Sequence, residues 1–334
     1  MASPRADLTL VRGLAVGHAQ DPTESSGVTV VRFRAPTPTV VDVRGGAPGT
    51  YDTASLALET TYGRRWAIFL TGGSLFGLDA ARGVRAEILA SGGGQRVFAN
   101  PNRVVPISGA VLFDLPKVER ALPDYEALGA AATRAASRRA VGSGRVGAGT
   151  GATVGKYLGR ARSMPGGLAS AGRRLEPRGA VGVLVAVNAV GAVRDPSTGR
   201  WVAGARNPMG RIAPPGTRRD RPARARGTTL AIVATDLAVE RSTLARIAAI
   251  VHAGLGRAIV PYLTSSDGDT VFAASTGVAG PPPDEAWPGA TADRIGTAAA
   301  ELAVAATLGA VLAAQHRSGA RRAGAKDRRT SRSV

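Results

Sequence analysis

The residue best suited to chemistry in this sequence is a threonine at the start of a predicted strand. Thr228 follows Gly227 and opens an aliphatic, β-branched run at 229–234, which is typical of a buried strand. If the preceding peptide bond broke, Thr228 would carry a hydroxyl nucleophile and an α-amine on one residue. The amine can then supply the base that an otherwise inert hydroxyl needs. The alternative is an ordinary Gly-Thr entry into a core strand.

Two carboxylates form a second candidate feature. Asp267 and Asp269 flank Gly268 immediately before another predicted strand. Like charges this close raise the pKa of one partner, so one acid can hold a proton while the other orients a donor. The alternative is a β-turn, or a cation loop with too few ligands.

A polar residue within an apolar run is the third feature. Asn188 interrupts the predicted strand 180–190, where a buried amide is costly unless it is hydrogen-bonded. It either caps the strand or donates its amide protons to an oxyanion. Lys156 lies just after the glycine-rich loop 142–151, whose GxGxxG pattern follows a predicted helix rather than a strand. This order argues against a dinucleotide site and favours a loop whose backbone passes near a site.

The hydrophobic periodicity predicts strands and helices that alternate along the chain. The loop 44–50 holds three glycines and a proline, so we expect irregular backbone that approaches another segment closely. Asp124 is expected to cap one of the helices. The expected strands are 8–17, 28–33, 39–43, 66–70, 107–115 and 180–190, together with the run that begins at 228; the expected helices are a short one from about 53, then 71–89, 123–139, 241–257 and 292–315.

Composition excludes several classes of site. The chain has 334 residues, 44% of them hydrophobic, and no cysteine, which rules out disulfides, thiolate metal sites and a cysteine nucleophile. No metal or other cofactor is expected. Residues 1–21 lack the apolar core of a signal peptide, and the apolar run 302–314 is too short to span a bilayer. We therefore expect a cytoplasmic protein without a membrane partner.

The formal net charge of +19 is concentrated in two segments. Residues 217–226 hold five arginines and one aspartate, and residues 317–334 hold seven basic residues and one aspartate. Such composition predicts disorder, and the basic tail 316–334 is expected to be disordered. No aromatic residues alternate with these charges, as a stacking surface for bases would require. The charge therefore predicts non-specific attraction to anions and no dedicated nucleic-acid site.

Taken together, several stretches resemble one family, the autoprocessing aminopeptidases and amidases of the DmpA type. This family includes β-peptidyl aminopeptidases and the endo-type nylon-oligomer hydrolase. The similar stretches occur in the family order and cover most of the chain. They are GLAVGH at 13–18, VDVRGGAPGT at 41–50, LTGGS at 70–74 with GLDAA at 77–81, GAGTG at 147–151, VNA at 187–189, the run 228–236, and DGDTVFA at 267–273.

The resemblance implies an α/β fold, a four-layer α/β/β/α sandwich like that of N-terminal-nucleophile hydrolases. It implies one catalytic domain, 1–315, cut by the protein itself into an α subunit, 1–227, and a β subunit, 228–334. The expected partners are a small peptide, amide or ester substrate and the chain's own cleaved subunit. A homo-oligomer of processed protomers is also expected.

The resemblance also implies roles for individual residues. The cleavage site is Gly227–Thr228, and Thr228 is the nucleophile for self-cleavage and for substrate hydrolysis. Asp267 and Asp269 would orient its hydroxyl and amine, Asn188 would donate to the oxyanion, and Lys156 would tune the field around the nucleophile.

Two positions depart from the pattern of the family. Gly227 stands where many threonine members have Asn, and its conformational freedom is expected to assist the acyl shift. Phe113 stands where some members have a substrate-binding Tyr.

Two other functions remain compatible with the sequence. Ornithine acetyltransferase shares the implied architecture and a self-made N-terminal threonine but transfers an acetyl group. The second alternative is an unprocessed, non-catalytic member of the family that functions in binding. The DGDT stretch and the glycine-rich signature favour the hydrolase.

Overall fold

In a computed structural model of the protein, residues 7–23, 25–115, 121–216, 225–283 and 287–330 are described. For residues 317–330 the description covers the backbone only. Most of the basic loop 217–226 and residues 331–334 therefore lie outside the described part.

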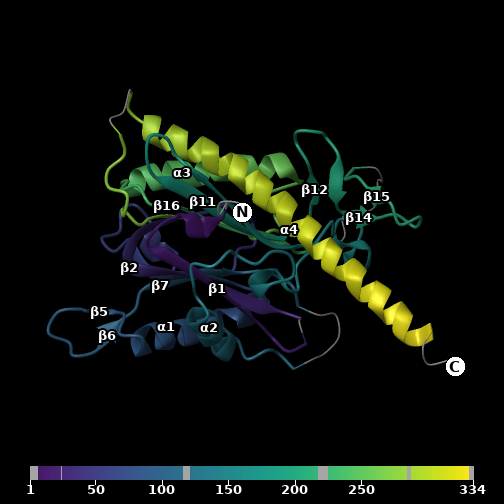
Figure 1. The fold of residues 1–334 in the computed structure, drawn as a ribbon, viewed down its shortest axis with the longest axis horizontal. Coiled ribbons are helices and arrows are strands. Elements are labelled where there is room, and N and C mark those ends of the chain that lie inside the picture. Colours follow the sequence, from purple (N-terminus) through teal and green to yellow (C-terminus); the bar gives the residue numbers. More distant parts are fainter. Residues whose placement is uncertain (1–6, 24, 116–120, 217–224, 284–286, 331–334) are drawn as a thin grey trace, which may run out of the picture.

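Nine paired strands form the centre of the molecule (Figure 1). Their order is β10 (Gly167–Arg174), β11 (Ala180–Asn188), β16 (Thr228–Thr235), β18 (Thr270–Ser275), β2 (Gly27–Val43), β4 (Arg64–Thr71), β7 (Ile107–Val111) and β3 (Thr50–Tyr51), with β1 (Leu14–Gln20) paired to β2.

The long strand β2 joins two sheet layers. Its first part pairs with β1 and β4, and its last residues, from Thr39 to Val43, pair with β18. The register of β2 against β4 shifts between Arg32 and Thr37, so the strand is irregular where it leaves one layer for the other. The predicted strands 28–33 and 39–43 are therefore the two ends of one strand.

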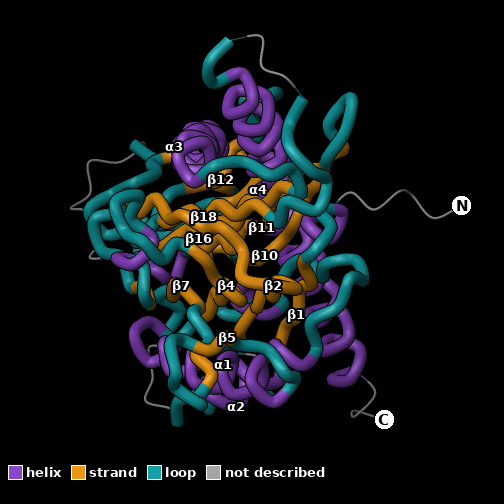
Figure 2. The backbone as a smooth tube through the Cα atoms, turned by 90° about the vertical axis from the view of Figure 1, so that its left-hand side faces the viewer, coloured by secondary structure: helices purple, strands orange, loops and turns teal. Residues whose placement is uncertain are grey.

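Helices cover the outer face of each layer (Figures 1 and 2). The helices α3 (Arg241–Ala258) and α4 (Ala290–Thr330) pack on β10, β11 and β18, whereas α1 (Ala80–Ala90) and α2 (Tyr125–Arg134) pack on β1, β2, β4 and β7. The order of layers is thus helix, sheet, sheet, helix. This arrangement confirms the predicted four-layer α/β/β/α sandwich.

The alternation of side chains along each strand explains why both faces of both sheets are buried. In β16, Ala231 and Val233 belong to the core under α3 and α4, whereas Leu230 and Ile232 belong to the core between the sheets. In β4 the same division separates the inter-sheet residues from those under α1 and α2. Because both faces of the strand are buried, its sequence must be apolar at every position, as it is in the run 230–234.

Several local predictions need correction. The predicted strand 8–17 begins as a 3-10 helix, Leu8–Leu10, because the Asp7 carboxylate accepts the Thr9 N–H and caps it. The predicted helix 71–89 is a 3-10 helix, Ser74–Asp79, followed by α1. The cap at Asp124 is confirmed, since its carboxylate accepts the Ala127 N–H.

The helix α4 also differs from expectation. It runs from Ala290 to Thr330, past the predicted end at residue 315, in keeping with the strong helix propensity of its alanines and arginines. The disorder expected for the tail 316–334 stays a prediction. By length and composition alone, the part Ala290–His316 is apolar enough to cross a membrane, which the run 302–314 had not indicated. That part is mostly buried, and Ala299, Ala303 and Ala310 pack in the core, as a core helix would.

The remaining elements are short. They are β5 (Gln95–Arg96), β6 (Arg103–Val104), β8 (Thr153–Val154), β9 (Met164–Pro165), β12 (Ala192–Arg194), β13 (Trp201–Ala203), β14 (Ala205–Arg206), β15 (Ile212–Ala213), β17 (Ile259–Val260), and the 3-10 helices Ala54–Leu56, Gly147–Gly149 and Arg160–Arg162.

Candidate active site

Strand directions bring the predicted site residues to one edge of the sheet. Strand β16 is parallel to β18, so Thr228 and the pair Asp267 and Asp269 all lie where these strands begin. Strand β11 is antiparallel to β16, and its last residue, Asn188, is the register partner of Thr228. Three segments separated in sequence therefore meet at the Gly227–Thr228 peptide.

The Gly227–Thr228 peptide is intact and held at both ends. The Thr228 hydroxyl donates to the carbonyl oxygen of Gly227, next to the carbon that it would attack. The same oxygen accepts the Gly268 N–H at 3.2 Å, and the Gly227 N–H donates to the Ser266 carbonyl at 3.1 Å. Donors to this carbonyl favour negative charge on its oxygen, which is the charge that an attack by the hydroxyl would develop.

Position 227 has no room for a side chain. A Cβ added to Gly227 would lie 2.3 Å from Asp267 Oδ1, 2.5 Å from the Val190 nitrogen and 2.8 Å from the Asn188 carbonyl oxygen. Gly227 does not have a positive φ. Conformational freedom was the expected reason for this glycine, and the structure gives a different one, which is close packing of the backbone against a carboxylate and a neighbouring strand.

Asp267 is buried and accepts two hydrogen bonds. Its Oδ1 accepts the Val190 N–H at 3.1 Å, and its Oδ2 accepts the Thr264 hydroxyl at 2.5 Å. Burial raises the pKa of Asp267, while these donors and the nearby Lys156 oppose the rise. This carboxylate lines the space beside the Gly227 backbone.

Asp269 lies on the other side of the junction. Its Oδ1 accepts the Thr229 N–H at 2.6 Å, and its Oδ2 accepts the Leu263 N–H at 3.0 Å. Burial, reinforced by the charge of Asp267, raises the pKa of Asp269 to about 7. A carboxylate with this pKa can take up a proton near neutral pH. The two carboxylates of the DGD stretch therefore lie beside the Gly227–Thr228 junction, and the charge of Asp267 contributes to the raised pKa of Asp269.

Asn188 has its amide orientation fixed by its neighbours. Its Oδ1 accepts the Thr153 N–H at 3.0 Å and the Lys156 ammonium at 2.7 Å, which leaves the amide nitrogen to donate to the Phe113 carbonyl at 3.0 Å. Lys156 Nζ also donates to the Asn188 carbonyl oxygen at 2.5 Å. Burial lowers the pKa of Lys156 to about 7, against the opposing effect of Asp267. The glycine-rich loop thus delivers Lys156 to the strand end where Thr228 begins.

Phe113 lies close to the chain that leads to the junction. The Arg226 guanidinium stands 5.5 Å from the centroid of the Phe113 ring, in a cation–π contact. Because Arg226 precedes Gly227, the ring contacts the segment that self-cleavage would free. All the residues predicted for the site therefore gather here.

Sequence reasoning missed three residues of the loop before β18. Gly268 donates its N–H to the Gly227 carbonyl, Ser266 accepts from Gly227, and Thr264 holds Asp267. The first two act through the backbone, which no side-chain pattern reveals. The role of Thr264 could have been predicted, since a threonine three residues before a buried aspartate can donate a hydrogen bond to it. The loop 44–50 approaches as predicted, with the Gly45 N–H donating to the Asp269 carbonyl.

The fold and the site together define a class of protein. A four-layer sandwich in which a strand begins with a hydroxyl residue, buried against the preceding carbonyl, is the arrangement of an N-terminal-nucleophile hydrolase in its uncut form.

Comparison with known proteins gives the family. Residues 6–324 match the model of peptidase family S58, and the chain belongs to this family of peptide- and amide-bond hydrolases. A Mycobacterium tuberculosis protein named as an aminopeptidase is 37% identical over 92% of this chain and 94% of its own length. A 6-aminohexanoate-oligomer endohydrolase of a Kocuria species is 33% identical over 79% of this chain and 73% of its own.

A solved structure supports the fold. The L-aminopeptidase D-Ala-esterase/amidase of Ochrobactrum anthropi, described as a variant of the N-terminal-nucleophile hydrolase fold, superposes with a TM-score of 0.65. The match covers 94% of this chain and 88% of that one, at 21% identity. These comparisons confirm the resemblance found in the sequence, and they favour a hydrolase over an acetyltransferase.

The crowding at position 227 predicts the effect of one added methyl group. In Gly227→Ala the new Cβ would overlap Asp267 Oδ1 and two backbone atoms, and such overpacking typically costs about 1–3 kcal/mol. We expect this shift of the scissile carbonyl to slow self-cleavage at least about tenfold. Gel electrophoresis of freshly made protein over time measures the rate.

Gly256→Ala serves as the control. Its Cβ would meet only the Tyr262 ring, at an ordinary 3.5 Å, so this variant should be cut at the wild-type rate. A Gly227→Ala protein with wild-type cleavage and unchanged thermal stability would contradict the packing account.

Proposed function

We propose that the protein is an autoprocessing N-terminal-threonine hydrolase that cleaves N-terminal residues from peptides, or small amino-acid amides and esters, through an acyl-enzyme. The proposal rests on the contact between the Thr228 hydroxyl and the Gly227 carbonyl, which also accepts the Gly268 N–H and lies beside two buried carboxylates. Membership of peptidase family S58 supports the same reaction class.

Self-cleavage proceeds through an N→O acyl shift. Thr228 Oγ attacks the Gly227 carbonyl carbon and loses its proton, the C–N bond breaks, and the nitrogen gains a proton to become an amine. Water then hydrolyses the resulting ester, which leaves a Gly227 carboxylate and a free Thr228 hydroxyl. Because Thr228 still has an amide nitrogen before the cut, the first base comes from elsewhere. Asp267 and Asp269, the buried carboxylates beside the Gly227–Thr228 junction, are the candidates for this base.

Substrate hydrolysis repeats this chemistry with an external carbonyl. In the processed enzyme the α-amine of Thr228 takes over as base, and Asp267 and Asp269 orient the hydroxyl and the amine. The Gly268 N–H, which already reaches the Gly227 carbonyl, stabilises the oxyanion. The Asn188 amide, whose nitrogen donates to the Phe113 carbonyl in the uncut chain, is proposed as a second donor. Lys156 donates to the Asn188 side-chain oxygen, and its protonated form favours the anionic intermediate.

The uncut chain also suggests which substrates fit. Gly227 occupies the place of the acyl group, with its N–H on Ser266 and its carbonyl on Gly268. A substrate amine can replace that N–H, whereas an L-side chain on the adjacent carbon would meet Asp267 Oδ1 and backbone atoms. We therefore propose a preference for acyl groups that are unbranched beside the carbonyl. The 6-aminohexanoyl unit named for the Kocuria relative is of this type. The Phe113 ring, which Arg226 covers in the uncut chain, would then contact the substrate.

This preference predicts a ratio of rates. The processed enzyme should hydrolyse glycyl p-nitroanilide with a kcat/KM at least about tenfold above that for L-alanyl p-nitroanilide, the discrimination expected for one methyl group in a tight site. Absorbance of released p-nitroaniline gives both values, and 6-aminohexanoyl p-nitroanilide tests a longer unbranched acyl group. An equal or higher kcat/KM for the alanyl substrate would refute the preference and leave the self-cleavage proposal standing.

The assignment of the nucleophile has its own test. Thr228→Ala should give a single 33.9 kDa band on a denaturing gel, whereas the wild type should give two fragments. Thr229→Ala is the control, and it should still be cut because its Oγ is not the attacking atom. Two fragments from Thr228→Ala would rule the mechanism out, and an uncut wild type would favour the non-catalytic alternative.

Assembly and location belong to the same proposal. We expect processed protomers to form a homo-oligomer and to act in the cytoplasm, with α4 serving as a core helix rather than a membrane span.

A further inference from the structure

A cavity lined by arginines lies at the far end of the catalytic strand. Its volume is about 820 Å³, within the range of sites that bind small molecules. Strand β16 begins at Thr228, and Asp236, in the lining, follows its last residue. Eight residues of strand separate the two places by about 25 Å. The cavity therefore is distinct from the candidate active site.

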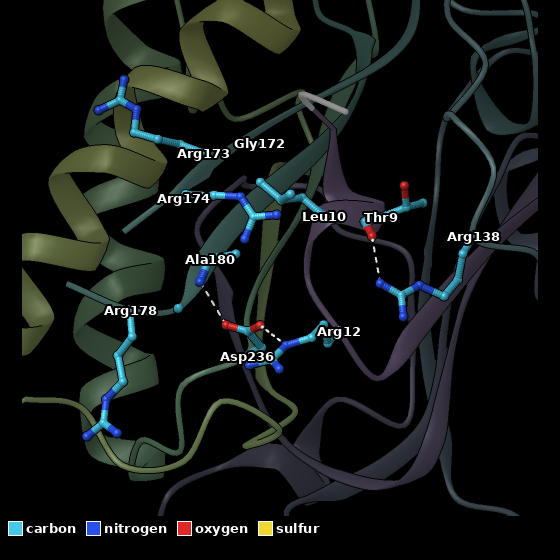
Figure 3. Close-up of a pocket in the computed structure, with 11 residues that line it drawn as sticks. Thr9, Leu10, Arg12, Arg138, Gly172, Arg173, Arg174, Arg178, Ala180 and Asp236 are labelled. Atoms are coloured by element: carbon cyan, nitrogen blue, oxygen red, sulfur yellow. Dashed lines mark hydrogen bonds and ion pairs between the residues drawn. The ribbon is translucent and has the colours of Figure 1, made fainter. Parts of the chain in front are cut away.

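Three guanidinium groups from separate segments converge on this cavity (Figure 3). Arg12 follows the first 3-10 helix, Arg138 follows α2, and Arg174 ends β10. In Figure 3, Arg174 reaches toward Leu10 and Arg138 reaches toward Thr9 from the opposite side. Arg173 and Arg178 also belong to the lining but point away, and Arg173 pairs with Glu301 of α4 at 2.8 Å.

The lining of the cavity includes one carboxylate, Asp236, which already has hydrogen-bond and ion-pair partners. Asp236 is buried, accepts the Ala180 N–H at 2.7 Å and pairs with Arg12 Nε at 3.0 Å. Among the described residues, the Arg138 guanidinium makes one long contact of 3.4 Å, to the Thr9 carbonyl. The Arg174 backbone pairs with Ala180 in the sheet, but its guanidinium has no hydrogen bond or ion pair with any described residue. Two positive charges thus face the cavity without a matching anion.

The positive surface continues beyond the cavity. A neighbouring hollow of about 470 Å³ shares Arg12 and Arg138 and adds Arg32 and Arg34. An anion with several charged groups offers a partner to more than one of these guanidinium groups, whereas an anion with one charged group does not. Arginine forks bind phosphate oxygens in pairs, and the mutual repulsion of the arginines falls when such an anion is bound.

We propose that this arginine-lined cavity is a binding site for a small anion that carries several phosphate groups. Arg138 and Arg174 hold the anion from opposite sides, and Arg12 is kept in place by Asp236. The site is independent of self-cleavage, because it lies at the opposite end of β16 from the scissile bond.

Calorimetric titration with sodium tripolyphosphate tests the proposal on the full-length protein, at about 150 mM salt so that long-range attraction is screened. The wild type should bind the probe. Arg138→Ser/Arg174→Ser should weaken the affinity at least tenfold, and both residues are exposed, so the fold should survive. The control Arg246→Ser/Arg257→Ser removes the same charge from exposed positions of α3 and should bind like the wild type.

Two further probes identify the ligand chemistry. Citrate, which carries three carboxylates, should bind more weakly than tripolyphosphate, and a short DNA duplex should not depend on Arg138 and Arg174. The proposal is overturned by a wild type that does not bind tripolyphosphate, by an equal loss in both double variants, or by tighter binding of citrate. Duplex binding that needs the two arginines while tripolyphosphate does not bind would overturn it as well.

Discussion

The site depends on the close approach of one backbone carbonyl to a buried carboxylate and to the edge of a neighbouring strand. Gly227 lies so near Asp267 and Val190 that even a methyl group would overlap them. This contact fixes the carbonyl where the Gly268 N–H and the Thr228 hydroxyl both reach it. The surrounding sheet thus maintains the reactive geometry through packing.

The sheet supplies that packing through the directions of its strands. Parallel pairing of β16 with β18 places the loop 264–269 beside Gly227, and antiparallel pairing with β11 places Asn188 beside Thr228. Each of these strands is buried on both faces, so its register depends on how its side chains fit into the two closely packed cores. A slip of β16 by one residue would exchange its two apolar faces and move Thr228 away from Asn188. The stability of the sandwich and the alignment of the site are thus set by the same side chains.

Much of this was accessible from the sequence because the chemistry depends on side chains of unusual type in apolar surroundings. Asn188, Asp267 and Thr228 stand out against strand patterns, and their order along the chain resembles a known family. The contributions of Gly268 and Ser266 were not accessible, because they come from backbone groups in a loop without periodicity. The reason for Gly227 was also missed, since space around a residue depends on distant segments. The end of α4 was also missed, because alanines and arginines that favour helix continue past the predicted end at residue 315.

The central claim is that this chain breaks its own backbone between Gly227 and Thr228. The mass spectrum of the purified wild-type protein under denaturing conditions tests it most directly. We expect two species, residues 1–227, less any processing of the first methionine, and residues 228–334 with an unmodified threonine at the amino terminus. A single mass near 33.9 kDa, or fragments with ends at another residue, would contradict it.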